Sequence, residues 1–197
     1  MIKNPILLDF PLPIQTKRLL IRPMMPGDGK QMFDAIQESR TILQEWMDWV
    51  DNVKSPEDSE STAREFYAKF ILRQEFTFVI LREGNLIGTC NLHHIRWNIP
   101  AAAIGYWCRV REQGNGYIRE GIPALTKYAF HALKFKRITI LADDANTKST
   151  SIPETLNFNL ETTSKGLLAK PNTDELRLGR LYVRFDAEGL EDWETKW

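Results

Sequence analysis

A polar loop in the second half of the chain leads directly into a segment with the apolar spacing of a helix face. Its residues are Gln113, Gly114, Asn115, Gly116 and Tyr117. The first N–H groups of a helix lack an intrahelical partner, and the helix dipole adds partial positive charge, so such a junction can bind a phosphate. The two glycines would let that ligand approach the backbone. We interpret the loop as an anion site for a nucleotide-like cofactor; a simple glycine turn is the alternative.

Polar side chains that could donate hydrogen bonds or move protons lie in two other stretches. Asn146 and Ser149 stand at the start of a short predicted helix, where each could equally be a helix cap. His93 and His94 are adjacent in a predicted strand, so alternation places them on opposite sides of the sheet. We take His93, which shares its side with polar Asn91, as the candidate general base. A histidine merely packed in the sheet is the alternative.

These residues need a scaffold, and the hydrophobic pattern predicts alternating strands and helices. Strands are predicted at residues 17–23, 76–82, 86–97, 101–110, 136–142 and 178–185, with a strand or loop at 161–170. Helices are predicted at residues 29–38, 41–50, 56–74, 118–133 and 146–156. Asp28 and Ser55 are the predicted N-caps of the first and third helices.

The glycine loop lies between two predicted strands that we expect to be parallel. The strand at 101–110, the helix after the loop and the strand at 136–142 form a strand–helix–strand crossover. The loop then sits at the carboxyl end of a strand, where open α/β sheets usually bind ligands. This position favours the cofactor interpretation over a simple turn.

The composition indicates one globular domain of balanced charge. The chain has 197 residues, 43% of them hydrophobic, and we expect a single domain over residues 1–197. Lysine plus arginine equal aspartate plus glutamate at 26 each, so no basic field indicates direct nucleic-acid binding. No apolar stretch reaches the roughly 18 residues of a membrane span. Cys90 and Cys108 lack C-x-x-C spacing, which predicts no metal site and reduced thiols in a cytoplasmic protein.

Two motifs together resemble the GNAT acetyltransferase superfamily. The branch to which they are most similar is that of RimJ/RimL-like ribosomal-protein N-terminal alanine and serine acetyltransferases. The resemblance covers about residues 16–186. The motifs are Ile104-Gly105-Tyr106-Trp107 followed by the loop at 113–117, and Asn146-x-x-Ser149-x-x-Ile152-Pro153-Glu154-x-Leu156-x-Phe158.

The resemblance implies an α/β fold of the GNAT kind. Its centre would be a mixed, mostly antiparallel sheet of six to seven strands, flanked by helices, with a splayed strand pair that binds the acyl-CoA. It also implies acetyl-CoA as donor, an amine as acceptor and direct transfer in a ternary complex. The acceptor would be a protein N-terminus or a small-molecule amine, and a homodimer is one assembly open to such a chain.

Site residues follow from the same resemblance, one position at a time. The loop would hold the pyrophosphate of coenzyme A through its backbone amides, with Ile118 next to it in the cofactor site. Cys108 matches a strand position along the pantetheine arm, and Asn146 matches a residue that hydrogen-bonds that arm. Ser149 matches a hydroxyl at the thiol, where a donor would stabilise the departing thiolate.

The chain also departs from the family pattern. The glutamate of the common Ala-Glu-Ile-Gly-Tyr-Trp strand is Ala103 here, so a frequent carboxylate base is missing. The usual glycine before Phe158 is Asn157, and Pro123 lies inside the predicted cofactor helix, which it could bend. A catalytically weak acyl-CoA-binding or sensing protein is therefore a second hypothesis.

A dinucleotide-binding oxidoreductase is a third class, and the sequence disfavours it. Its glycine fingerprint needs a third glycine where Arg119 stands. Within the acetyltransferase hypothesis, a site without a strong carboxylate base suits an α-amine better than a lysine. The pKa of an α-amine is near 8, whereas a lysine of pKa near 10.4 is only about 0.1% neutral at pH 7.5.

Overall fold

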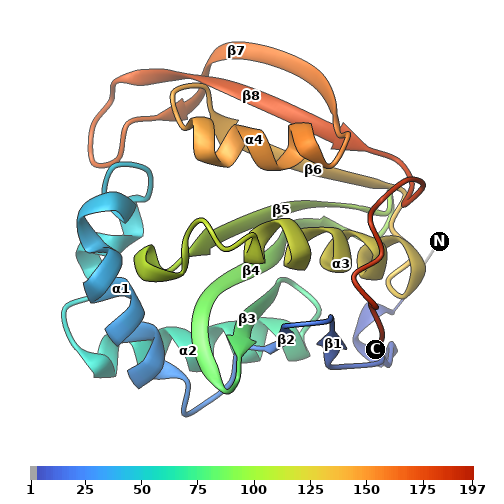
Figure 1. Cartoon of the computed structure of the whole chain (residues 1–197), viewed down its shortest axis with the longest axis horizontal. Helices are drawn as coiled ribbons and strands as arrows, with labels where there is room; N and C mark the ends of the chain where they lie inside the picture. The colour runs from blue at the N-terminus through green and yellow to red at the C-terminus, as the bar shows by residue number, and fades with distance from the viewer. Residues whose placement is uncertain (1–3) are drawn as a thin grey trace.

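One mixed sheet of eight strands forms the centre of the computed structural model, which describes residues 4–197 (Figure 1). The first three residues of the expected domain lie outside this description. The strands are β1 Ile14–Gln15, β2 Leu20–Pro23, β3 Phe76–Arg82, β4 Asn85–Arg96, β5 Ala101–Cys108, β6 Arg137–Asp143, β7 Asn159–Ala169 and β8 Leu176–Arg184. Their order is β1-β2-β3-β4-β5-β6-β8-β7, and every neighbouring pair is antiparallel except β5 and β6.

The expected fold class is confirmed, with eight strands in place of six or seven. One addition is the two-residue β1, which pairs with β2. The other is β7, which the sequence left as a strand or a loop. Nearly all of its side chains are exposed, so no alternation of apolar residues marks it, and it exists as a strand because it pairs with β8 along most of its length.

The helices flank this sheet. They are α1 Gly29–Leu43, α2 Pro56–Ile71, α3 Tyr117–His131 and α4 Thr147–Thr155, with 3-10 turns at Pro5–Leu7, Asp48–Asn52 and Val110–Glu112. The helix predicted at 41–50 is wrong: α1 continues to Leu43, and only the short turn Asp48–Asn52 follows. Arg40 explains this, because its guanidinium donates to the carbonyl oxygens of Val50 and Val53 and folds the following chain back onto α1.

One of the two predicted N-caps is confirmed. Ser55 Oγ accepts from the N–H of Asp58 at 3.2 Å, and Asp58 Oδ2 accepts from the N–H of Ser55 at 2.8 Å, a complete capping box. Asp28 stands at the N-cap position of α1 but does not cap it. Its carboxylate instead pairs with Arg22 at 2.7 Å and accepts from the N–H of Met25 at 2.9 Å.

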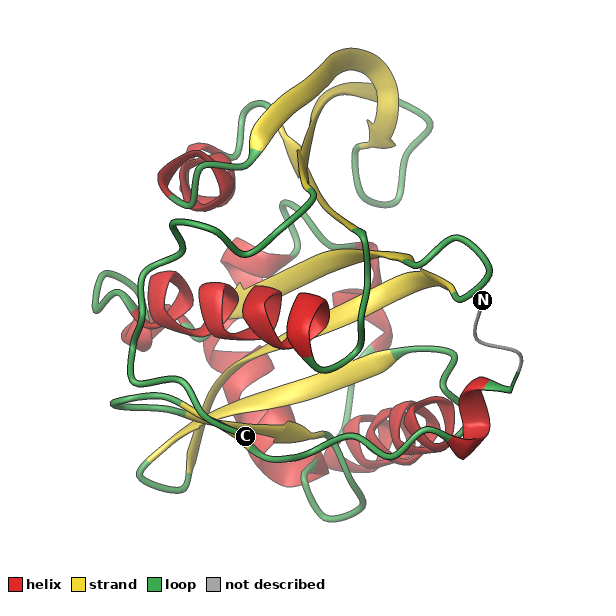
Figure 2. Ribbon diagram, turned by 90° about the vertical axis from the view of Figure 1, so that its right-hand side faces the viewer, coloured by secondary structure: helices red, strands yellow, loops and turns green. Residues whose placement is uncertain are grey.

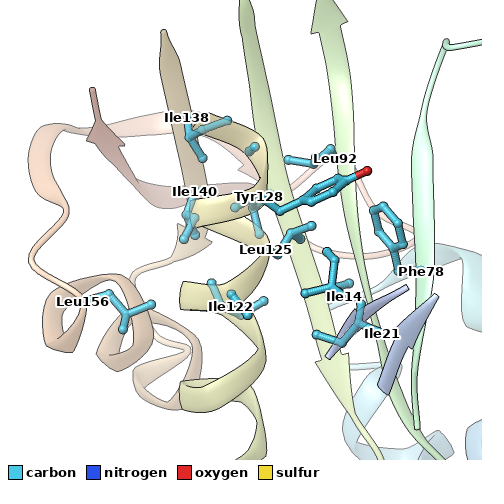
Figure 3. Close-up of a cluster of buried hydrophobic side chains, with 14 of the residues drawn as sticks. Ile14, Ile21, Phe78, Leu92, Ile122, Leu125, Tyr128, Ile138, Ile140 and Leu156 are labelled. Atoms are coloured by element: carbon cyan, nitrogen blue, oxygen red, sulfur yellow. The ribbon is translucent and has the colours of Figure 1, made fainter. Parts of the chain in front are cut away.

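Two clusters of buried side chains lie on opposite faces of the sheet. On one face, α3 and α4 pack against alternate residues of the central strands. Figure 3 shows Leu125 and Tyr128 of α3 between Phe78 and Ile140, with Leu156, directly after α4, nearby. On the other face, α1 and the first half of α2 cover the intervening residues, with Val79 and Trp107 in the cluster. The sheet thus has two covered faces, one under α3 and α4 and the other under α1 and α2.

Pro123 does not interrupt α3, which continues from Tyr117 to His131. The helix gains stability here from burial rather than from a complete ladder of hydrogen bonds, since Ile122, Pro123 and Leu125 are all buried. Asn157 has φ 54°, a left-handed conformation that asparagine tolerates better than most residues. It can therefore take the place of the family's glycine.

The two parallel strands separate soon after they pair. Bonded partners are residues 101–103 of β5 and residues 137–139 of β6. Beyond them β5 follows β4 as far as Cys108, while β6 follows β8 as far as Asp143. Each strand is held on its outer side by a different antiparallel partner, so the two diverge (Figures 1 and 2). The splayed pair expected from the resemblance is present, between β5 and β6.

Candidate functional site

The glycine loop has the geometry of an anion cradle. Gly114 and Gly116 have φ values of 82° and 77°, which glycine adopts without strain, and Gly116 is the N-cap of α3. Among the described residues, no acceptor binds the backbone N–H groups of residues 114–119. Successive unpaired N–H groups at a helix N-terminus attract an anion.

Arg18 and Glu120 hold this loop in place, and no local sequence pattern indicates either residue. Glu120, in the first turn of α3, is fully buried and accepts from the Thr16 hydroxyl at 2.6 Å and from the N–H of Arg18 at 2.8 Å. Its other oxygen lies 2.5 Å from Arg18 Nε. Arg18 Nη1 in turn donates to the carbonyl oxygen of Asn115 at 3.1 Å, and its guanidinium lies over the Tyr117 ring.

The residues predicted to meet the pantetheine arm lie on both sides of the strand split. Tyr106 Oη of β5 donates to the carbonyl oxygen of Ser149 on α4 at 2.9 Å. Asn146 Oδ1 accepts from the N–H of Ser149 at 3.1 Å, so Asn146 does cap α4. The Ser149 hydroxyl forms no hydrogen bond within residues 4–197 and is free to meet a ligand.

Cys108 ends β5 beside the loop, where its carbonyl oxygen accepts from Gln113 Nε2 at 3.3 Å. Burial, and to a smaller extent the charge of Glu112, raises the pKa of its thiol to about 12. The thiolate, not the thiol, is the nucleophile in cysteine catalysis. At neutral pH the Cys108 thiol is therefore protonated.

His93 and His94 do not occupy opposite sides of the sheet as predicted. Their ring centroids are 4.5 Å apart. His94 has φ 51°, and the pairing of β4 with β5 shifts register between His93 and Arg96, so alternation ends at this point. His93 stays on the predicted side of the sheet, with Ala103 as its cross-strand partner. The His94 ring turns toward the His93 ring.

A polar network that the sequence analysis missed lies beside His93. Asn91 Oδ1 accepts from the N–H of Gly105 at 2.9 Å, and Asn91 Nδ2 donates to Glu75 Oε1 at 3.1 Å. A β-carbon on Gly105 would lie 2.6 Å from Asn91 Oδ1 and 3.7 Å from His93 Nε2. A glycine inside a strand often marks such a close approach, and Gly105 was the available signal.

The charged groups around His93 affect its pKa. Burial lowers the pKa of His93 below its usual value of 6.5, and the neighbouring His94 lowers it further. The Glu75 carboxylate opposes both effects. Its side chain is 18% exposed and also lies 3.4 Å from Lys69 Nζ. His93 is therefore neutral at physiological pH, the form that can accept a proton.

The described residues, 4–197, contain neither a metal cluster nor a spanning helix. No three or more His, Cys, Asp or Glu side chains among them are arranged to hold a metal ion. Likewise, none of their helices has both the length and the apolar character needed to cross a membrane.

Comparisons with known proteins point to one family. The family of acetyltransferase (GNAT) domains matches residues 18–159. A ribosomal-protein-serine acetyltransferase of Escherichia coli (strain K12) is 28% identical over 135 residues, which are 67% of this chain and 74% of that protein.

Two solved structures share the fold at lower identity. RimJ of Mycobacterium smegmatis, in complex with CoA-disulfide, has a TM-score of 0.81 at 19% identity, over 98% of this chain and 99% of that one. A RimL ribosomal L7/L12 α-N-protein acetyltransferase, in complex with coenzyme A, also has a TM-score of 0.81 at 19% identity, over 86% and 95%.

Proposed function

Since the chain belongs to the family of acetyltransferase (GNAT) domains, and so transfers acetyl from acetyl-CoA to an amine, we propose that its acceptor is the α-amine of a protein N-terminus. The curated relative acts on a ribosomal protein, as its name states. A protein acceptor is thus the class that the similarity favours, and the chemistry around His93 favours an α-amine within that class.

The observation that carries the proposal is the split between β5 and β6, with a different chemistry at each side. The cradle at residues 114–119 and the Ser149 hydroxyl lie along the split, where pyrophosphate and thiol would bind. His93 and the Asn91–Glu75 network lie at its base, on the sheet face away from α3. A thioester reaching through the split would meet an amine beside the imidazole.

The proposed reaction is one direct transfer. The neutral amine nitrogen attacks the thioester carbonyl carbon, the carbon–sulfur bond breaks, and its electron pair leaves with sulfur. Ser149 donates a hydrogen bond to the developing thiolate, and the His93 imidazole takes the proton that the amine nitrogen loses. Cys108, being protonated, takes no acetyl group, so no acyl-enzyme intermediate is required.

The missing family carboxylate at Ala103 limits the acceptors that this site can activate. An imidazole whose pKa lies below 6.5 is a weak base for a lysine ammonium of pKa near 10.4. A protein α-amine has a pKa near 8 and is partly neutral before it binds. The site therefore suits an amine that needs little help in losing its first proton.

The test compares two peptides with the same internal sequence. One has a free N-terminus and no lysine, and the other has a blocked N-terminus and one lysine. We expect release of free CoA with the first peptide at a kcat/KM at least about 10² higher, following the difference in neutral amine. A preference for the lysine peptide would overturn the α-amine proposal. Binding of acetyl-CoA without transfer to any amine would instead favour the sensing hypothesis.

A further inference from the structure

A cavity of about 450 Å³ opens on the sheet surface at the base of the split. Its floor is made of small residues of β5, among them Ala103, together with Thr139 of β6. Ala103 is the cross-strand partner of His93, so the cavity begins about 5 Å from the candidate base. An acceptor peptide whose amine meets His93 therefore has this cavity within reach of its next residues.

The cavity wall carries basic side chains and no carboxylate. His94, Arg96 and Arg137 all line it. Arg96 is exposed and has no ion-pair partner within residues 4–197. Arg137 forms a two-pronged ion pair with Glu161 of β7, with Nη1 at 2.8 Å from Oε1.

The substitution at position 103 makes this charge available. A glutamate there, as in the common family strand, would enter the cavity beside Thr139 and offer Arg96 and Arg137 a carboxylate from within the protein. Alanine leaves the space open and the arginines facing it. A carboxylate supplied by the acceptor would restore the missing negative charge.

We propose that this cavity binds an acidic side chain, aspartate or glutamate, at the second or third residue of the acceptor peptide. Arg96 supplies the main contact to that side chain. Arg137 adds a second contact to the extent that its ion pair with Glu161 opens. In an extended peptide each residue adds about 3.3 Å, so such a side chain can reach the cavity while the α-amine lies at His93. The inference rests on the proposed acceptor class and adds to it a sequence preference.

The experiment uses peptides that differ at one position only, with glutamate, glutamine or lysine at residue two, and a second set varied at residue three. We expect kcat/KM to be about 5- to 10-fold higher for glutamate than for glutamine in one set, since one charge-assisted hydrogen bond is gained. The gain should appear in KM and shrink with added salt. Lysine should be the poorest.

Three variants assign the effect to the cavity. Arg96→Gln should remove most of the difference in kcat/KM between the glutamate and glutamine peptides. Glu161→Gln should increase the glutamate preference, because it frees Arg137. Lys30→Gln is the matched control: it removes an exposed positive charge on α1 that pairs with Asp34, and it should leave the ratio unchanged.

The failures can be told apart. Equal activity on all three peptides in both sets would overturn the inference while leaving the α-amine proposal standing. A glutamate preference of undiminished size in Arg96→Gln would also overturn it, because the recognition would then lie elsewhere. No activity on any free N-terminus would reject the proposed acceptor class itself.

Discussion

Lys148 Nζ lies 3.1 Å from Gln113 Oε1, so a side chain of α4 reaches the glycine loop across the split between β5 and β6. Together with the bond from Tyr106 to the Ser149 carbonyl, it joins the two sides of the proposed cofactor site. The contact also holds an ammonium group close to the unpaired N–H groups that begin at Gly114. In the proposed site, side-chain charge and backbone dipoles would therefore act on the same phosphate.

Lys148→Met should weaken acetyl-CoA binding about 10-fold, since one charge-assisted contact to a phosphate is lost. The salt dependence of the affinity should fall with it. Calorimetry at two ionic strengths measures both effects. Lys165→Met, on the exposed strand β7, is the control and should bind as wild type. Equal affinity of Lys148→Met and the control at low salt would remove Lys148 from the cofactor site.

Gly116→Val and Gly114→Val should each abolish most acetyl-CoA binding, because a branched side chain would cover the N–H groups of the cradle. Each should also lose stability, since valine resists a positive φ. Gly189→Val separates these effects: Gly189 has φ 70° and open space around it, but lies outside the cradle. It should lose stability and keep its affinity. Normal acetyl-CoA affinity in folded Gly116→Val would contradict the cradle.

Ser149→Ala should lower kcat about 10- to 100-fold, the cost of one lost donor to a developing anion. The melting temperature should change little, because the Ser149 hydroxyl has no hydrogen-bond partner among the described residues. Ser151→Ala, two residues along α4, is the matched control and should keep full kcat. A normal kcat together with a lower melting temperature in Ser149→Ala would show that Ser149 has only a structural role.

The rate should fall as pH drops below about 6.5, because His93 must be neutral to accept a proton. Its pKa is lowered by burial and by His94, so the acid limb should lie below 6.5. Glu75→Gln removes the charge that opposes this shift and should move the limb to still lower pH. His93→Gln should remove the limb and lower kcat/KM about 10².

His131→Gln, at the exposed end of α3, is the control and should retain the wild-type pH profile. Stability offers an independent readout. The folded pKa of His93 lies below its unfolded value, so unfolding takes up a proton between the two, and His93 should cost stability as pH falls below about 6.5. An unchanged pH–rate profile in His93→Gln would exclude His93 as the base.

Local features were predictable from the sequence because their causes lie within a few residues. The capping box at Ser55 depends on a residue three positions away, and the hairpin of β3 and β4 on a short turn. The parallel pairing of β5 and β6 follows from the short strand–helix–strand crossover that joins them. The glycine loop was readable for the same reason, since a helix N-terminus creates its own unpaired N–H groups.

Contacts between distant residues were decided only by the tertiary structure. Arg18 and Glu120 are 102 positions apart, and no pattern around either residue names the other. Asn91 could lie over Gly105 only after β4 and β5 had paired in their particular register. The bulge that turns His94 toward His93 arises from the same pairing, and it overrode the simple alternation on which the prediction rested.

The sequence by itself determined the fold class, the glycine loop at the start of α3 and the family, because periodicity, glycine position and capping act over short distances. The tertiary structure alone decided the acceptor side. His93 and Arg96 lie on β4, Arg137 lies on β6 and Glu75 lies in the loop before β3. The Glu75 carboxylate acts on His93, and Arg96 and Arg137 line one cavity, only because the sheet brings these segments together. Electrostatic interaction depends on distance in space, and that distance is set by packing and register rather than by spacing along the chain.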